Sequence, residues 1–128
     1  MEYLYVYVRA VVKKEVISMD NIQGALQLFL KGVRQIMGAN ISKILVYGSY
    51  ARGDYNENSD VDIMILSSLQ DEEIEVIEDA IYDVAFDIMM EYGIQISVIV
   101  KNEAHFRYWL GALPFYDNVE REGVELLG

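Results

Sequence analysis

Cysteine is absent from the 128 residues, which excludes disulfide bonds and thiolate metal sites. The chain also lacks any apolar run approaching the roughly 18–20 residues that a membrane-spanning helix needs. Its N-terminus lacks the basic start and small-residue cleavage site of a secretory signal. We therefore expect a cytoplasmic protein with no membrane partner.

Basic residues are scarce, because ten Lys and Arg stand against 21 Asp and Glu and give a net charge of −11. A protein that grips nucleic acid needs Lys and Arg to neutralise phosphates, and the one basic cluster here is Lys13-Lys14. The composition therefore argues against nucleic acid as a partner. A single nucleotide is still compatible with it, since a metal ion, one arginine and backbone dipoles can meet its charge locally.

Hydrophobic residues make up 53% of the chain, which is enough for one domain with a substantial core. Apolar residues recur at helical spacing from Ile22 to Met37, and Gly38 is a natural stop. A second helix is predicted over residues 69–92, introduced by a capping-box pattern at 68–71. Its acidic face indicates either a solvated surface or a docking surface for a basic partner.

Three short apolar runs predict strands at residues 43–47, 60–66 and 94–100. The tail predicts a helix over 102–110 and a shorter one that ends at Gly123. Together these elements predict an α/β protein of the two-layer α+β kind, with a small mixed sheet of about three to five strands packed against helices.

Residues 1–18 are predicted to be an extension that precedes the main domain at 19–128. Tyr3–Val12 alternates tyrosine with aliphatic residues, as a strand does. The extension is therefore an edge strand, an arm that forms a homodimer, a disordered segment, or the product of a wrongly chosen start codon, with Met19 as the true first residue.

Polar residues of the types that bind metals and phosphates lie between the first two predicted strands. Gly48-Ser49 follows one strand, and Asp60 and Asp62 open the next. Alternate residues of a strand share a face, so the two carboxylates should project together and need a counter-charge. Mg²⁺ is commonly held by one or two carboxylates plus substrate phosphates, and N–H groups at a helix start bind anions. The residues alone thus indicate a site for a metal-bound phosphate.

This stretch resembles the signature of the DNA polymerase beta-like nucleotidyltransferases, in which Gly-Ser is followed after ten residues by Asp-x-Asp. The intervening Ala51-Arg52-Gly53-Asp54 resembles its minimal branch, small proteins often found beside a helical protein of the HEPN type. The resemblance is close over about residues 41–65. It implies the nucleotidyltransferase fold for residues 19–128.

The resemblance also implies roles for individual residues. Asp60 and Asp62 would be the catalytic residues and would bind one or two Mg²⁺, with Mn²⁺ as a substitute. The nucleotide-binding residues would be Gly48, Ser49 and Arg52. An alternative role for Arg52 is an ion pair with Asp54.

The family pattern usually adds a third carboxylate from the strand after the long helix. The strand predicted at 94–100 contains no acid. Gln95 stands at the best-matching position, and Ser97 shares its face. Gln95 is therefore the candidate third position. An amide oxygen is a poorer metal ligand than a carboxylate and a poor general base, so this departure from the family pattern argues against catalysis.

Two functions follow from the resemblance. The first is an enzyme that transfers a nucleoside monophosphate, AMP from ATP in the simplest case, to a hydroxyl of a protein or small molecule. The second is a weakly active or inactive nucleotide-binding module that acts like an antitoxin by binding a helical HEPN-type partner. Although the missing third acid and the acidic helix support the second, we expect the enzyme.

Overall fold

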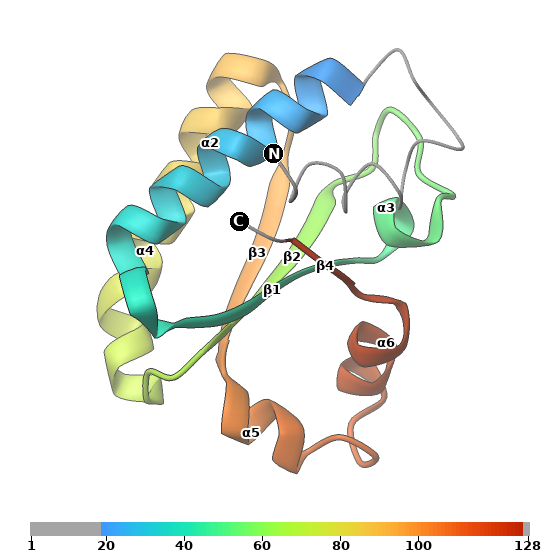
Figure 1. Ribbon diagram of the computed structural model, residues 1–128. Helices are drawn as coiled ribbons and strands as arrows, with labels where there is room; N and C mark the ends of the chain where they lie inside the picture. Colours follow the sequence, from blue (N-terminus) through green and yellow to red (C-terminus); the bar gives the residue numbers. More distant parts are fainter. Residues whose placement is uncertain (1–18, 127–128) are drawn as a thin grey trace.

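The computed structural model describes residues 19–126 (Figure 1), so the predictions for residues 1–18 lie outside the described part of the chain. The elements in order are α2 (Met19–Met37), the 3₁₀ helix η1 (Gly38–Asn40), β1 (Ile41–Tyr47), α3 (Ser49–Arg52), β2 (Val61–Ser67), α4 (Asp71–Tyr92), β3 (Ile96–Asn102), α5 (Glu103–Tyr108), α6 (Pro114–Glu122) and β4 (Val124–Glu125). Within residues 19–126, no helix has the length and apolar character needed to cross a membrane.

The four strands form one mixed sheet in the order β3-β2-β1-β4. β1 is antiparallel to both β2 and β4, whereas β2 and β3 are parallel. Parallel neighbours need a long crossover, and α4 supplies it. The predicted fold class and mixed sheet are confirmed.

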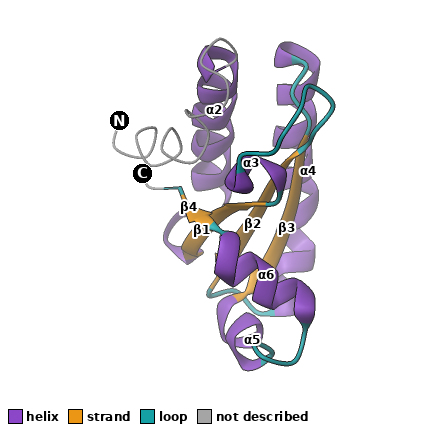
Figure 2. Ribbon diagram, turned by 90° about the vertical axis from the view of Figure 1, so that its right-hand side faces the viewer, coloured by secondary structure: helices purple, strands orange, loops and turns teal. Residues whose placement is uncertain are grey.

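Helices cover both faces of the sheet (Figures 1 and 2). Alternate residues of β2 point to opposite sides. Ile63 and Ile65 pack in the core formed with α2 and α4, whereas Met64 and Leu66 pack against α5 and α6. All four are fully buried, which explains why this strand reads as a continuous apolar run rather than an alternating one. The short helices α5 and α6 thus add a partial layer to the predicted two-layer arrangement.

Element boundaries differ slightly from the prediction. The long helix begins at Asp71, and its reciprocal cap is the Gln70 N–H donating to the Glu73 carboxylate at 2.9 Å, rather than a cap at residues 68–71. β3 begins at Ile96, two residues later than predicted. The two-residue strand β4 was not predicted at all.

The contact between α2 and α4 yields a testable prediction at Gly32. A Cβ there would lie 2.8 Å from the Val84 Cγ1 atom. Gly32→Ala is expected to lower the free energy of unfolding by about 1 kcal/mol, because overpacking costs roughly 1–3 kcal/mol and the gain in helix propensity returns only about 1 kcal/mol. Urea denaturation measures this. In a Val84→Ala background the loss should disappear, and an equal loss in both backgrounds would contradict the packing argument.

Candidate active site

The Gly48 turn joins β1 to α3 and sets the geometry of the site. Gly48 has φ 73° and ψ −152°, a region that is essentially restricted to glycine. A Cβ on Gly48 would overlap the Oδ2 atom of Asp62. The structure therefore places the Asp62 carboxylate directly against the backbone of the turn.

Asp62 lies in an electrostatically strained position. It stands opposite Tyr47 in the β1–β2 register, two residues after Asp60. Burial raises the pKa of the Asp62 carboxyl, and the negative charges of Asp60 and Glu122 raise it further, while Arg52 opposes them. The charge of Asp60 is thus close enough to act on Asp62, although β2 begins at Val61 and leaves Asp60 just before the strand.

The donor set fits a divalent cation that shares its shell with a phosphate. Within residues 19–126, Asp60 and Asp62 make no ion pair. No group of three or more His, Cys, Asp or Glu side chains in this range is arranged to hold a metal. Two carboxylates and a glycine against which a ligand can approach closely match Mg²⁺ held partly by protein and partly by substrate phosphates.

Three tyrosines lie next to the site. Tyr47 is 8% exposed, and burial together with the nearby Asp62 raises the pKa of its phenol to about 12. Tyr50 and Tyr55 stack with ring centroids 4.4 Å apart and planes 10° apart. Because Tyr50 belongs to α3 and is buried in the core, this stack fixes the helix and the loop that follows it.

Arg52 contacts two carboxylates. Its Nε donates to the Asp54 Oδ2 at 3.2 Å, which is the alternative partner expected from the sequence. Its Nη1 donates to the Glu122 Oε1 at 3.1 Å. The Gly48 N–H donates to the same Glu122 oxygen at 3.0 Å. Two of the three residues with predicted roles toward a phosphate, Gly48 and Arg52, are therefore engaged by one carboxylate.

Glu122 reaches the site because β4 pairs with β1. In this antiparallel pair Val46 is opposite Val124. Gly48 comes two residues after Val46, and Glu122, the last residue of α6, comes two residues before Val124, so the pairing brings these two residues together. The sequence analysis did not find Glu122. The only nearby sequence signal was the helix end predicted at Gly123. A helix end does not show which strand the following residues pair with.

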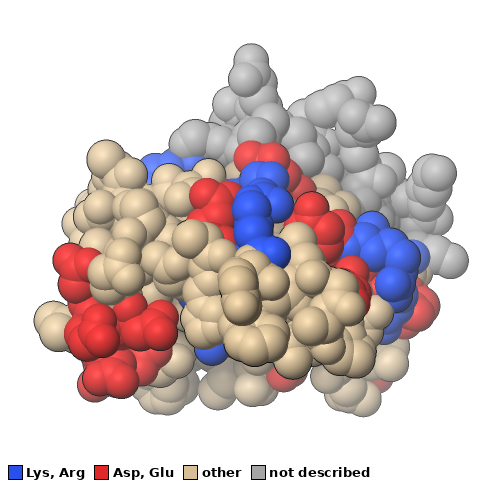
Figure 3. Space-filling view, turned by 90° about the horizontal axis from the view of Figure 1, so that it is seen from below, with Lys and Arg blue, Asp and Glu red and all other residues tan. Residues whose placement is uncertain are grey.

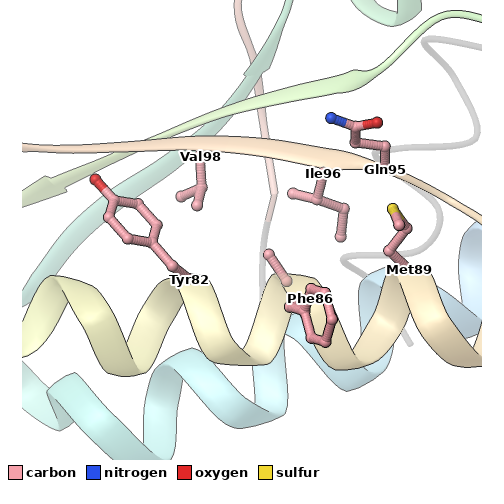
Figure 4. A pocket seen from close by; sticks show the side chains of 7 residues that line it. Tyr82, Phe86, Met89, Gln95, Ile96 and Val98 are labelled. Atoms are coloured by element: carbon pink, nitrogen blue, oxygen red, sulfur yellow. The ribbon is translucent and has the colours of Figure 1, made fainter.

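Ser97 lies on β3 beside the aspartates, and Gln95 directly precedes that strand. Ser97 is the register partner of Asp62, and the Gln95 carbonyl accepts the Val61 N–H at 2.9 Å. Figure 4 shows the Gln95 side chain on the opposite side of β3 from Ile96, turned away from α4. Gln95 also borders a groove of about 190 Å³ between α4 and β3. Its role as a third metal position stays a prediction.

A model of the nucleotidyltransferase domain matches residues 26–124, which include the Gly48 turn, both aspartates and Glu122. The chain belongs to the nucleotidyltransferase domain family. The family expected from the Gly-Ser and Asp-x-Asp motifs is therefore confirmed, and the protein is a nucleotidyltransferase.

Named relatives of this nucleotidyltransferase come from Methanocaldococcus jannaschii. One carries the provisional name protein adenylyltransferase MJ0604 and is 34% identical over 103 residues, covering 80% of this chain and 95% of that protein. A second, provisionally named protein adenylyltransferase MJ0141, is 33% identical over 100 residues, covering 77% and 91%. A crystal structure described as a toxin-antitoxin with AMP-PNP shares the fold with a TM-score of 0.52 and 19% identity, covering 80% of this chain and 72% of that one.

The surface below the sheet carries mixed charge. In Figure 3 the basic side chains of the nucleotidyltransferase lie in separate groups among acidic and uncharged ones, and the coloured residues on this face form no continuous basic patch. On α5 and α6, Arg107 lies between Glu103 at 3.3 Å and Glu120 at 3.9 Å. This face therefore offers little to a phosphate backbone.

Proposed function

We propose that this nucleotidyltransferase is Mg²⁺-dependent and transfers AMP from ATP to a hydroxyl group of a partner protein, with release of pyrophosphate. The observation that supports this most directly is the contact between the Asp62 carboxylate and the Gly48 turn. It joins a metal-binding side chain to a backbone that a phosphate can approach closely.

Each residue of the site has a defined task in this reaction. Asp60 and Asp62 would hold Mg²⁺, which when bound supplies charge neutralisation at the phosphorus under attack. Gly48 leaves room for a phosphate oxygen at the backbone, Ser49 donates its hydroxyl to that phosphate, and Arg52 pairs with its charge. The acceptor hydroxyl loses its proton to solvent as its oxygen bonds to the α-phosphorus, and the bond from that phosphorus to pyrophosphate breaks.

A protein is the favoured acceptor for two reasons. The relatives named above carry protein adenylyltransferase names, and a fold neighbour is described as part of a toxin-antitoxin. We propose a helical partner of the HEPN type whose hydroxyl-bearing residue receives AMP. A small-molecule acceptor is the second choice within the same chemistry.

The alternative function is a nucleotide-binding module that acts by occupying the same kind of partner without transfer. Two observations favour it. The described β3 contains no carboxylate beside Asp62, since its register partner is Ser97. Glu122 already holds the Gly48 N–H and Arg52.

Labelled ATP separates the two functions. The protein, Mg²⁺ and the product of a neighbouring gene are incubated with ATP carrying label on either the α- or the γ-phosphorus. Transfer of AMP places only the α-label on the partner, because the γ-phosphorus leaves with pyrophosphate. Omission of Mg²⁺ is the control.

Two other results would contradict AMP transfer as the function of this protein. Label on the partner from γ-labelled ATP would indicate phosphoryl transfer and contradict the proposal. A stable complex with ATP and partner, with no label transferred from either position, would support the binding module.

A further inference from the structure

The carboxylate of Glu122 engages two groups of the Gly48 turn that the proposed function assigns to the nucleotide. We propose that Glu122 stands in for a phosphate oxygen in the free protein, so that a triphosphate must displace it from the Gly48 N–H and the Arg52 guanidinium. This inference rests on the proposed function. It makes Glu122 a residue that sets the affinity for nucleoside triphosphates.

Hydrogen-bond geometry supports the stand-in role. One oxygen, Oε1, accepts from the Gly48 N–H at 3.0 Å and from Arg52 Nη1 at 3.1 Å. A backbone N–H and a guanidinium that converge on one anionic oxygen form the arrangement by which proteins bind phosphate. Glu122 satisfies it from within the chain.

Hydrogen bonding and charge make the two anions compete. Glu122, Asp60 and Asp62 already bring three negative charges, and Arg52 is the one cation that contacts this carboxylate within residues 19–126. A triphosphate next to Gly48 would add further negative charge. Mg²⁺ held by the aspartates would offset part of this charge, but the Gly48 N–H has a single hydrogen, which Glu122 already occupies. The carboxylate and the phosphate therefore compete for it, and their mutual repulsion adds to that competition.

The position of Glu122 permits the exchange. Glu122 is the last residue of α6, and its side chain is 18% exposed. Gly123 and the two residues of β4 follow it. A rotation of the Glu122 side chain toward solvent frees both donors without requiring β4 to leave β1.

The test is equilibrium binding of ATP, tripolyphosphate and adenosine to the full chain in the presence of Mg²⁺. Glu122→Gln keeps the length and shape of the side chain but removes its charge. It is expected to tighten binding of ATP and tripolyphosphate about tenfold. This is the lower end of what a hydrogen bond to a charged group contributes, because Arg52 is half exposed. Adenosine, which has no phosphate, should bind equally to both proteins.

The matched control is Glu120→Gln. Glu120 lies on the same helix, is 46% exposed and contacts Arg107 at 3.9 Å, away from the turn. Glu120→Gln makes the same change in net charge and should leave ATP affinity as it is. An equal gain in ATP affinity in both variants would show that the effect comes from net charge alone and would overturn the inference.

Two further outcomes separate this inference from the proposed function. If the wild type binds ATP and Glu122→Gln binds it equally or more weakly, Glu122 positions the turn rather than competing, and the inference fails while the function stands. If neither protein binds ATP or tripolyphosphate, both fail together. The amide resonance of Gly48 provides an independent readout, since added tripolyphosphate should shift it further in Glu122→Gln than in the wild type.

Discussion

Asp62→Asn is expected to abolish AMP transfer and, at the same time, to raise the melting temperature of the metal-free protein. Loss of one metal-binding carboxylate should cost several kcal/mol of transition-state stabilisation, which corresponds to a drop in rate of at least about a hundredfold. The α-label assay measures the loss. Retention of wild-type transfer would exclude Asp62 from the reaction.

The gain in stability has an electrostatic origin. Burial and the neighbouring Asp60 raise the pKa of the Asp62 carboxyl above its ordinary value of 3.8, so the folded state disfavours the charged form. Asparagine has nearly the same shape without the charge. We expect the melting temperature at pH 7 to rise by about 2–5 °C in the presence of a chelator.

The sign of this effect sets its pH dependence. Below the ordinary value of 3.8 the carboxyl of Asp62 is protonated in both the folded and the unfolded chain, so it contributes no difference. As the pH rises, the unfolded chain ionises first, and the penalty on folding grows until the folded carboxyl ionises too, after which the penalty stays constant. The advantage of Asp62→Asn should therefore grow as the pH rises above 3.8 and level off once the folded carboxyl is fully ionised.

The matched control is Asp83→Asn, which removes one charge from an exposed position on α4. It should change the melting temperature by much less than Asp62→Asn, because an exposed carboxylate is well solvated in both states. A lower melting temperature for Asp62→Asn, or an advantage that shrinks as the pH rises, would contradict the proposed strain at the site.

Gly48→Ala is expected to have the largest effect on the folded protein. Its backbone conformation, φ 73° and ψ −152°, costs a residue with a Cβ roughly 1–3 kcal/mol. The new methyl group would also meet the Oδ2 atom of Asp62. We expect a loss of about 3 kcal/mol or more in the free energy of unfolding, measured by urea denaturation, together with a loss of ATP binding.

Two comparisons separate backbone strain from the contact with Asp62. Gly38 also has a positive φ, 55°, but a Cβ there would meet no atom within 4 Å, so Gly38→Ala should cost only about 1 kcal/mol. Gly48→Ala made in an Asp62→Ala background keeps the strain and removes the overlap. It should therefore cost less than Gly48→Ala alone. If Gly48→Ala were as mild as Gly38→Ala, the close approach to Asp62 would be disproved.

The fold was predictable where the sequence carries a long periodic signal. The long helix α4 and the strands β1 and β2 were expected close to their observed bounds, because apolar spacing reports the face that each element buries. The turn between those strands was also expected, since a glycine between an apolar run and a polar loop marks a change of direction. Family membership followed from the spacing of Gly48-Ser49 and the two aspartates.

The part of the site that depends on distant pairing was not predictable. β4 has only two residues, too few for an alternating pattern, and its partner β1 lies far away in the sequence. No local property of Glu122 distinguishes it from its acidic neighbour Glu120. Its contact with Gly48 depends on the antiparallel pairing of β1 with β4, two strands that lie far apart in the sequence.

The pairing of β4 with β1 has a consequence for how a partner could control this protein. If a partner protein binds α6 and separates β4 from β1, it also moves Glu122 away from the Gly48 turn without contacting the nucleotide. Thermodynamic reciprocity then requires that a bound nucleotide, by displacing Glu122, favour the same partner by an equal factor. In that case α6 would couple nucleotide binding to partner binding, so that each raises the affinity for the other.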